Sequence, residues 1–333
     1  MNQSLRSLRF RDENEQTWKR LEALIGKVER RGAGGLSAEE AIELPRLYRA
    51  TLSSLSVARE TLLERATLQY LDALVARGYL AVYTEHKHPF EAISEFFSTA
   101  WSRSVRAIGW ETLTATVIFF AGATAAYALV AGDADWFFSF VNRAFAAGRT
   151  PEATAESLRV GLYTPADASR LSIFAAELFS NNTGVALLAF ALGFAFGVPT
   201  AFLLFYNGAL LGAMMYVYAS KGLAFGFTGW LLIHGVTELL AIVLAGAAGL
   251  RIGRAVAFPG KLTRLGSARR AGQDTAPAMI GVCLMLVLAA ILESFGRELI
   301  ISDTVRYSIA VTSGLFWLIY FVVPGRRGKV ATL

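Results

Sequence analysis

The sequence predicts an all-α membrane protein, with about six transmembrane helices following an N-terminal cytoplasmic helical bundle. Three observations support this fold class. Hydrophobic residues make up 54% of the 333 residues and charged residues only 17%, whereas soluble domains carry about 25% charged residues. Residues 1–106 hold 16 of the 32 lysines and arginines and 14 of the 26 acidic residues. The remainder contains apolar runs that approach the about 20 residues needed to cross a bilayer.

The charged first third reads as amphipathic helices. Residues 12–31 carry apolar side chains at helical spacing and end at a Gly-Ala-Gly-Gly breaker. Ser37 and Glu40 fit a capping box, in which each side chain accepts from an exposed amide of the first turn. The apolar stripe then predicts one long helix to about Arg77, closed by Gly78, with Pro45 as a kink or restart. We expect these helices to pack as a small bundle. A helix displayed to bind a partner is the alternative.

An aromatic segment joins this bundle to the first span. Residues 88–110 alternate aromatic and charged positions at helical spacing, which favours an amphipathic helix in the membrane interface. The cytoplasmic domain is therefore expected to cover residues 1–106 and the transmembrane domain residues 107–333. His86 and His88 flank a lysine without a nearby carboxylate cluster, so a solvated loop is favoured over a metal site. The N-terminus carries no signal-peptide pattern, which places the first domain in the cytoplasm.

Six apolar runs predict six spans. They lie near residues 113–131, 185–206, 209–220, 227–250, 278–292 and 308–323. Asn207 and Gly208 separate the second from the third, because both residues tolerate the left-handed backbone of a turn. Asn181 and Asn182 are suited to cap the second span. Glycines at four-residue spacing in this region favour helix packing over a transport role.

The distribution of basic residues sets the expected orientation. The 251–276 loop holds six basic residues and one acidic residue, whereas the 132–182 loop holds four basic and six acidic residues. Cytoplasmic loops carry the excess of lysine and arginine, so both termini are expected in the cytoplasm of a bacterium and the protein in its inner membrane. The outer 132–182 loop contains two amphipathic stretches, which favour helices lying on the bilayer over a ligand-binding loop.

His234 and Glu238 stand in an otherwise apolar span, four residues apart on one helical face. Ionisable residues inside a membrane mark functional sites by default, because each costs several kcal/mol unless it is paired or hydrated. Gly235 beside them favours close approach of a second helix. Two functions fit the pair: a site for a proton, cation or polar solute, and a structural clasp between helices or subunits.

Several functional classes are disfavoured. The span lacks the second histidine of a metalloprotease motif, so neither a catalytic zinc nor another metal is expected. The cytoplasmic part shows no nucleophile elbow, phosphate-binding loop or carboxylate dyad, and we expect no enzymatic activity and no cofactor. Cys283 is the single cysteine and reads as a small buried hydrophobe. The basic residues flank apolar runs, so no nucleic-acid partner is expected.

Several segments resemble the stage II sporulation protein M family. The resemblance rests on residues 18–25, 47–59, 181–212, 234–253 and 291–310, and its most specific part is the His-Gly-x-x-Glu-Leu segment preceded by Asn-Gly. It implies a polytopic inner-membrane protein. The founding member resembles a scaffold for peptidoglycan-degrading partners during engulfment, a process that relatives in non-sporulating bacteria do not share. His234, Gly235 and Glu238 match the family motif as positions, without an implied catalytic role.

Two functional hypotheses follow. The first is a membrane scaffold or assembly factor for cell-envelope processes that self-associates, with a dimer favoured, and recruits protein partners through its bundle. The second is a channel or transporter in which His234 and Glu238 bind a proton, cation or polar solute. Membrane lipids are expected partners in both. A weaker third reading makes the basic 251–276 loop a lipid-headgroup site.

Overall fold

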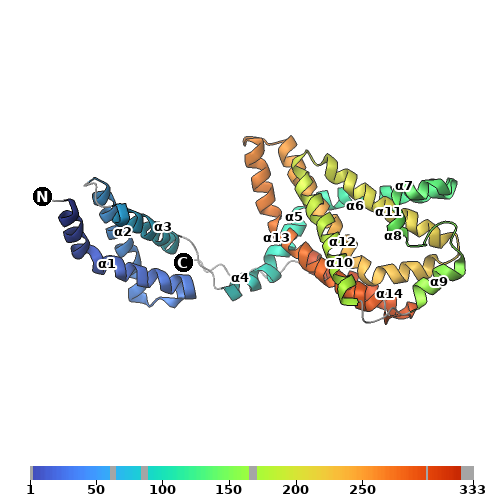
Figure 1. The fold of residues 1–333 in the computed structure, drawn as a ribbon, viewed down its shortest axis with the longest axis horizontal. Coiled ribbons are helices and arrows are strands. Elements are labelled where there is room, and N and C mark those ends of the chain that lie inside the picture. The colour runs from blue at the N-terminus through green and yellow to red at the C-terminus, as the bar shows by residue number, and fades with distance from the viewer. Residues whose placement is uncertain (1–2, 61–64, 84–88, 165–170, 298, 324–333) are drawn as a thin grey trace. The chain divides into compact units, whose positions relative to one another are not determined.

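The computed structural model describes residues 3–60, 65–83, 89–164, 171–297 and 299–323. In these residues the chain is all-helical, as the sequence predicts, and it divides into two compact units, Met1–Glu95 and Phe96–Leu333. The helices α1, α2 and α3 of the first unit and the long helices of the second can be followed in Figure 1. His86, His88 and the basic C-terminal residues 325–333 lie outside the described residues.

Three helices form the bundle of the first unit. These are α1 (Gln3–Arg31), α2 (Ala38–Glu60) and α3 (Arg65–Tyr83), with a short 3-10 turn at Ala33–Gly35. Their apolar stripes meet in one core whose fully buried members include Leu21, Leu24 and Leu71. The expected single helix to Arg77 is therefore wrong, because the stripe folds back on itself between α2 and α3.

Gly78 lies inside α3 and does not end it. A Cβ atom there would stand 2.9 Å from the Tyr48 ring, so the glycine allows α2 and α3 to approach closely. α2 also continues through Pro45, where the sequence had suggested a kink or restart.

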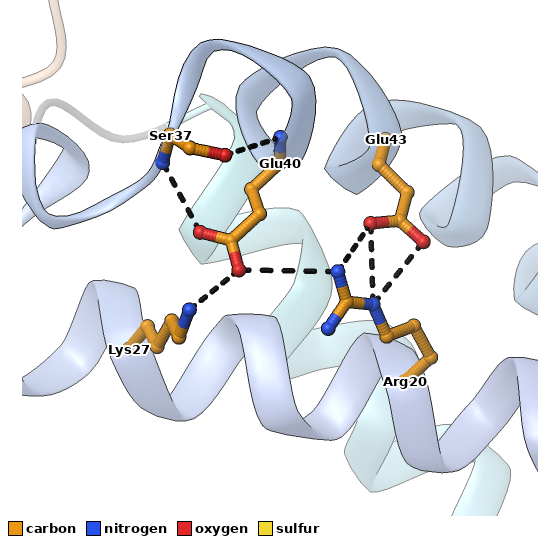
Figure 2. Close-up of polar contacts among 5 residues, drawn as sticks. All are labelled: Arg20, Lys27, Ser37, Glu40 and Glu43. Atoms are coloured by element: carbon orange, nitrogen blue, oxygen red, sulfur yellow. Dashed lines mark hydrogen bonds and ion pairs between the residues drawn. The ribbon is translucent and has the colours of Figure 1, made fainter.

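The capping box at the start of α2 is confirmed (Figure 2). The Ser37 amide donates to Glu40 Oε2 at 3.1 Å, and the Glu40 amide donates to Ser37 Oγ at 3.2 Å. Lys27 of α1 donates to the other Glu40 oxygen at 2.5 Å, and Arg20 donates to Glu43 at 2.7 Å. The bond from Lys27 holds the pKa of Glu40 below its usual value, and Arg20 does the same for the pKa of Glu43.

The segment between bundle and first span consists of α4 (Pro89–Glu95), a π-helical turn at Phe96–Ala100, and α5 (Trp101–Ala107). Trp101 is buried, contacts the rings of Trp317 and Phe321, and lies so close to Gly281 that no Cβ atom would fit there. α5 is thus part of the second unit, which is why that unit begins at Phe96, earlier than the expected boundary after residue 106.

The second unit contains six long helices among the described residues, α6 and α10 to α14. They are α6 (Gly109–Gly132), α10 (Leu171–Ala191), α11 (Val198–Ala219), α12 (Ala224–Ala257), α13 (Arg264–Ile291) and α14 (Asp303–Val322). In the described part of the chain, five of them, all but α10, are long and apolar enough to cross a membrane. The protein is therefore a multi-pass membrane protein by helix length and hydropathy. α12 is the central helix, because it contacts all five others and its apolar window is 67% buried.

The expected break at Asn207 and Gly208 is not found, since α11 runs through both residues. The Asn207 amide donates to the Leu203 carbonyl at 2.8 Å, which satisfies the side chain within the helix. Gly208 lies against the backbone of Phe119 in α6, where a Cβ atom has no room. The chain turns instead at residues 192–197, through a 3-10 turn (Leu192–Phe194) and the positive φ angles of Phe196 and Gly197. Asn181 and Asn182 lie inside α10 and do not cap it.

The segment 133–163 folds against the long helices. It forms a 3-10 turn (Ala134–Trp136), α7 (Phe137–Phe140), α8 (Arg143–Ala146) and α9 (Ala155–Tyr163). Phe137 and Leu162 are buried in one core with α6, α11 and α12. Tyr163 donates to Asp303 at 2.8 Å, and the fully buried Arg306 donates to the Leu162 carbonyl at 2.6 Å. These bonds fasten α9 to the start of α14, so this part of the loop belongs to the core of the unit.

Candidate functional site

His234 and Glu238 of α12 lie one turn apart on the buried side of the helix. His234 Nε2 is 3.9 Å from Glu238 Oε2, and the exposed fractions of the two side chains are 5% and 15%. α12 is enclosed by its neighbours, so both side chains face protein. The site is buried within a single chain, so no second subunit is needed to cover it.

A third ionisable residue, Glu293, completes the cluster. Its Oε1 atom is 3.7 Å from His234 Nε2, and its side chain is 7% exposed. One ligand atom from each of His234, Glu238 and Glu293 lies within 4.8 Å of the other two. The sequence had placed Glu293 in the loop after the fifth span, and the structure corrects this.

Glu293 reaches the cluster because the helix continues past Ile291 as a π-helical turn, Leu292–Arg297. Such wide turns at the end of an α-helix often occur at functional sites, since they change the direction of a side chain without ending the helix. Gly296 on the next turn allows close contact, because a Cβ atom there would stand 3.0 Å from Ile233 of α12. One signal could have found Glu293: it directly follows an apolar run that can continue as a helix.

The surroundings of the cluster are mostly apolar and aromatic. The Trp230 ring stands perpendicular to the His234 ring with centroids 6.4 Å apart. Trp317 of α14 donates to Thr237 Oγ1 at 2.9 Å, which joins α14 to α12 within one turn of His234. Ser294 next to Glu293 is fully buried, and its hydroxyl has no hydrogen-bond partner among the described residues. This enclosure fixes the helices on each side of the site.

Gly235 does not serve close helix packing. Among the described residues and outside the helix's own backbone, a Cβ atom there would meet only the Leu231 side chain of the same helix, at 3.4 Å and beyond. Other glycines of α12 do serve packing. Gly249 approaches the backbone of Ala189, and Gly253 approaches that of Gly197.

The cluster has the composition and spacing of a cation site. A neutral imidazole nitrogen and two carboxylate oxygens are ligands that zinc and other divalent first-row metals accept. Two atoms that each lie about 2.1 Å from one zinc ion at a tetrahedral angle are about 3.4 Å apart. The two nitrogen–oxygen separations, 3.7 and 3.9 Å, are close to that value and longer than hydrogen bonds. Three protein ligands would leave a coordination position open. A proton at this site would be carried by one of the three groups, because separations of 3.7 and 3.9 Å are too long for a proton shared between them.

Comparisons with known proteins match the chain to two sequence families. The family described as stage II sporulation protein M matches residues 115–296, which is more than half of the chain. A domain of unknown function (DUF8413) matches residues 8–84, the region of the α1–α3 bundle. No curated protein and no solved structure matches the chain. His234, Glu238 and Glu293 all lie within the first matched region.

Proposed function

We propose a transport function for this chain, which belongs to the stage II sporulation protein M family. In this proposal the protein is a transporter or channel that binds a proton or a metal cation at His234, Glu238 and Glu293. One observation carries the proposal. Three ionisable groups from two elements converge within 4.8 Å inside the bundle of long apolar helices. Burying two carboxylates there is costly unless a positive charge accompanies them, and a bound cation or proton supplies that charge.

The proposal includes the place and orientation of the protein. The 251–276 segment, with six basic residues and one acidic residue, supports a cytoplasmic position for the connection between α12 and α13. The C-terminus is then cytoplasmic, because α13 and α14 cross the membrane in opposite directions. We propose that α10 (Leu171–Ala191) crosses the membrane as a sixth span, which places the N-terminus in the cytoplasm too, and that the membrane is the bacterial inner membrane. We propose no catalytic role for the cluster, because its enclosed position offers no site for an organic substrate to react.

Ion flux in liposomes tests the transport proposal. The full-length protein is reconstituted with a pH-sensitive or a zinc-sensitive dye inside the vesicles. We expect flux above that of empty vesicles in the wild type and its loss in Glu293→Gln. The matched control is Ser294→Ala, which changes a buried neighbour on the same turn but keeps all three ligands. Flux that is equal in wild type and Glu293→Gln would sink the proposal.

A scaffold is the second candidate, and the separate bundle favours it. The α1–α3 bundle has its own core and its own family match. At the end of α3 it exposes the large side chains of Tyr79, Leu80 and Tyr83, each more than half exposed. Exposed aromatic groups of this kind are common at protein interfaces. In this proposal the bundle recruits envelope proteins and the chain self-associates as a dimer, while the buried cluster acts as a clasp between α12 and α13.

Mass measurement in detergent and a deletion separate the two candidates. A scaffold predicts a dimer in the wild type, no ion flux, and loss of partner recruitment when residues 1–95 are removed. A transporter predicts that the same deletion leaves flux intact, because the three cluster residues lie in the second unit. A monomer that shows flux after the deletion would contradict the scaffold.

A further inference from the structure

A second charged cluster lies at the far end of α12. Glu111, in the first turn of α6, is 7% exposed. Its Oε1 atom lies 2.6 Å from an Arg254 nitrogen and 3.4 Å from an Arg251 nitrogen. One buried carboxylate oxygen therefore orients two guanidinium groups. Each guanidinium has five N–H donors, so most donors of both arginines remain available for another acceptor.

These two arginines line a cavity of about 470 Å³. Arg270, Ser267 and Asp274 of α13 line it as well, and Phe258 at the C-terminal end of α12 completes the lining. Three guanidiniums face the carboxylates of Asp274 and Glu111, so the cavity keeps an excess of positive charge. Fork-shaped guanidinium donors with a hydroxyl beside them are the groups that proteins use to bind phosphate oxygens.

Helix geometry places the cavity at the depth of lipid headgroups. α12 has 34 residues and is about 51 Å long at 1.5 Å per residue, well beyond the about 30 Å of bilayer hydrocarbon. The apolar stretch of α12 ends at Leu250, and Arg251 is the first basic residue after it. Basic residues at the end of a membrane-spanning stretch lie at the level of the headgroups.

Exposed apolar side chains lie at and after the end of α12. Phe258, which lines the cavity, is 80% exposed, and Leu262 and Leu265 are 48% and 81% exposed. Phe258 and Leu262 lie in the short connection between α12 and α13, and Leu265 lies in the first turn of α13 next to Arg264, whose guanidinium stands 5.7 Å from the Phe196 ring centroid. Apolar side chains beside arginines suit a surface that inserts into acyl chains while its charges meet headgroups.

We propose that the cavity formed by Arg251, Arg254, Arg270 and Ser267 binds the phosphate group of an anionic phospholipid headgroup. The same chemistry would accept the phosphate of a soluble ester. The exposed apolar side chains and the depth of the cavity favour the lipid as the source. This site is separate from the cluster at His234 and lies at the opposite end of α12.

Lipid binding by the full-length protein in detergent tests the inference. Native mass spectrometry measures the affinity for phosphatidylglycerol and for phosphatidylcholine, and inorganic phosphate is added as a competitor. The test variant is Arg270→Gln, because Arg270 is exposed and its removal does not strand the buried Glu111. The matched control is Arg269→Gln, an exposed neighbour that does not line the cavity. Ser267→Ala is a second variant in case Arg270→Gln alters folding.

We expect the wild type to prefer phosphatidylglycerol and Arg270→Gln to bind it about fivefold more weakly, the loss that about 1 kcal/mol per basic residue implies. Arg269→Gln should change the affinity by less than half as much. Displacement of phosphatidylglycerol by inorganic phosphate in the wild type, but not in Arg270→Gln, would support the anion site and assign it to a soluble phosphate. Two results would overturn the inference. One is an equal loss of phosphatidylglycerol affinity in Arg270→Gln and Arg269→Gln. The other is a wild type that does not prefer phosphatidylglycerol to phosphatidylcholine and whose lipid binding inorganic phosphate does not change.

Discussion

Replacing Glu293 with glutamine distinguishes a cation site from a structural clasp by the sign of its effect on stability. The Glu238 and Glu293 ligand oxygens lie within 4.8 Å of each other. At an effective dielectric constant of about 20, two negative charges at that distance repel by about 3.5 kcal/mol. If His234 is neutral and no cation is bound, Glu293→Gln removes this repulsion and should stabilise the protein by up to about 3.5 kcal/mol.

The clasp predicts the opposite sign. A protonated His234 attracts Glu293 across 3.7 Å by about 4.5 kcal/mol at the same dielectric constant. Glu293→Gln then loses this attraction and removes the weaker repulsion, so the variant should be less stable by about 1 kcal/mol. The two hypotheses therefore predict changes of opposite sign, and the change expected for the clasp is the smaller of the two.

Thermal unfolding of the full-length protein in detergent provides the assay, with chelator and then with zinc or manganese. We expect the wild type to gain about 2.7 kcal/mol when the free cation is at 100 times its dissociation constant. Glu293→Gln should start higher than the wild type in chelator and gain little from the cation. Ser294→Ala should keep the gain, because it leaves all three ligands in place. A variant that is less stable in chelator, with a wild type that does not respond to any cation, would refute the cation site.

Three further predictions concern packing and pH. Gly212→Val should destabilise the second unit by about 1–3 kcal/mol or more, because a Cβ atom would stand 2.8 Å from the Ala123 Cα atom of α6. Gly184→Ala is the control: it lies in open space within α10, so it should not lower the melting temperature, since alanine favours a helix over glycine. Leu24→Ala in the fully buried core of the bundle should cost about 2–5 kcal/mol in denaturant unfolding. The pKa of Glu40 is lowered, first by its hydrogen bond with Lys27. The ionised Glu40 side chain therefore stabilises the bundle at pH values above the usual carboxyl pKa of 4.5, and this stabilisation is lost as the pH falls through the lowered pKa. Glu40→Gln should therefore weaken the acid dependence of bundle unfolding, measured by denaturant titrations between pH 7 and pH 3, and an unchanged acid dependence would contradict the assigned ion pair.

The capping box shows what local sequence can determine. Ser37 and Glu40 are three residues apart, and their reciprocal bonds involve only the first turn of one helix. No distant residue has to be in place for such bonds to form, so spacing alone predicts them. The membrane assignment is local in the same sense, because a long apolar helix needs only its own composition to be recognised.

Asn207 and Gly208 show where local reasoning fails. Alone, this pair favours a turn, but α11 continues because Gly208 lets it lie directly against the backbone of α6. A hydrogen bond from Asn207 to Leu203 then removes the cost of a polar side chain there. The contact with another helix outweighs the local preference, and that contact lies nearly a hundred residues away in sequence.

The amino-acid sequence by itself determined the all-helical class, the division into a charged bundle and an apolar membrane part, and the pair of His234 and Glu238 on one helical face. These properties follow from periodicity and composition, which act over one or two helical turns. Only the tertiary structure decided that the stripe after Ser37 folds back as two helices, that α12 lies at the centre, and that Glu293 joins the pair. Those outcomes depend on how whole helices pack against one another, α2 against α3 in the first unit and α12 against α13 in the second, and no local preference encodes the register between two helices.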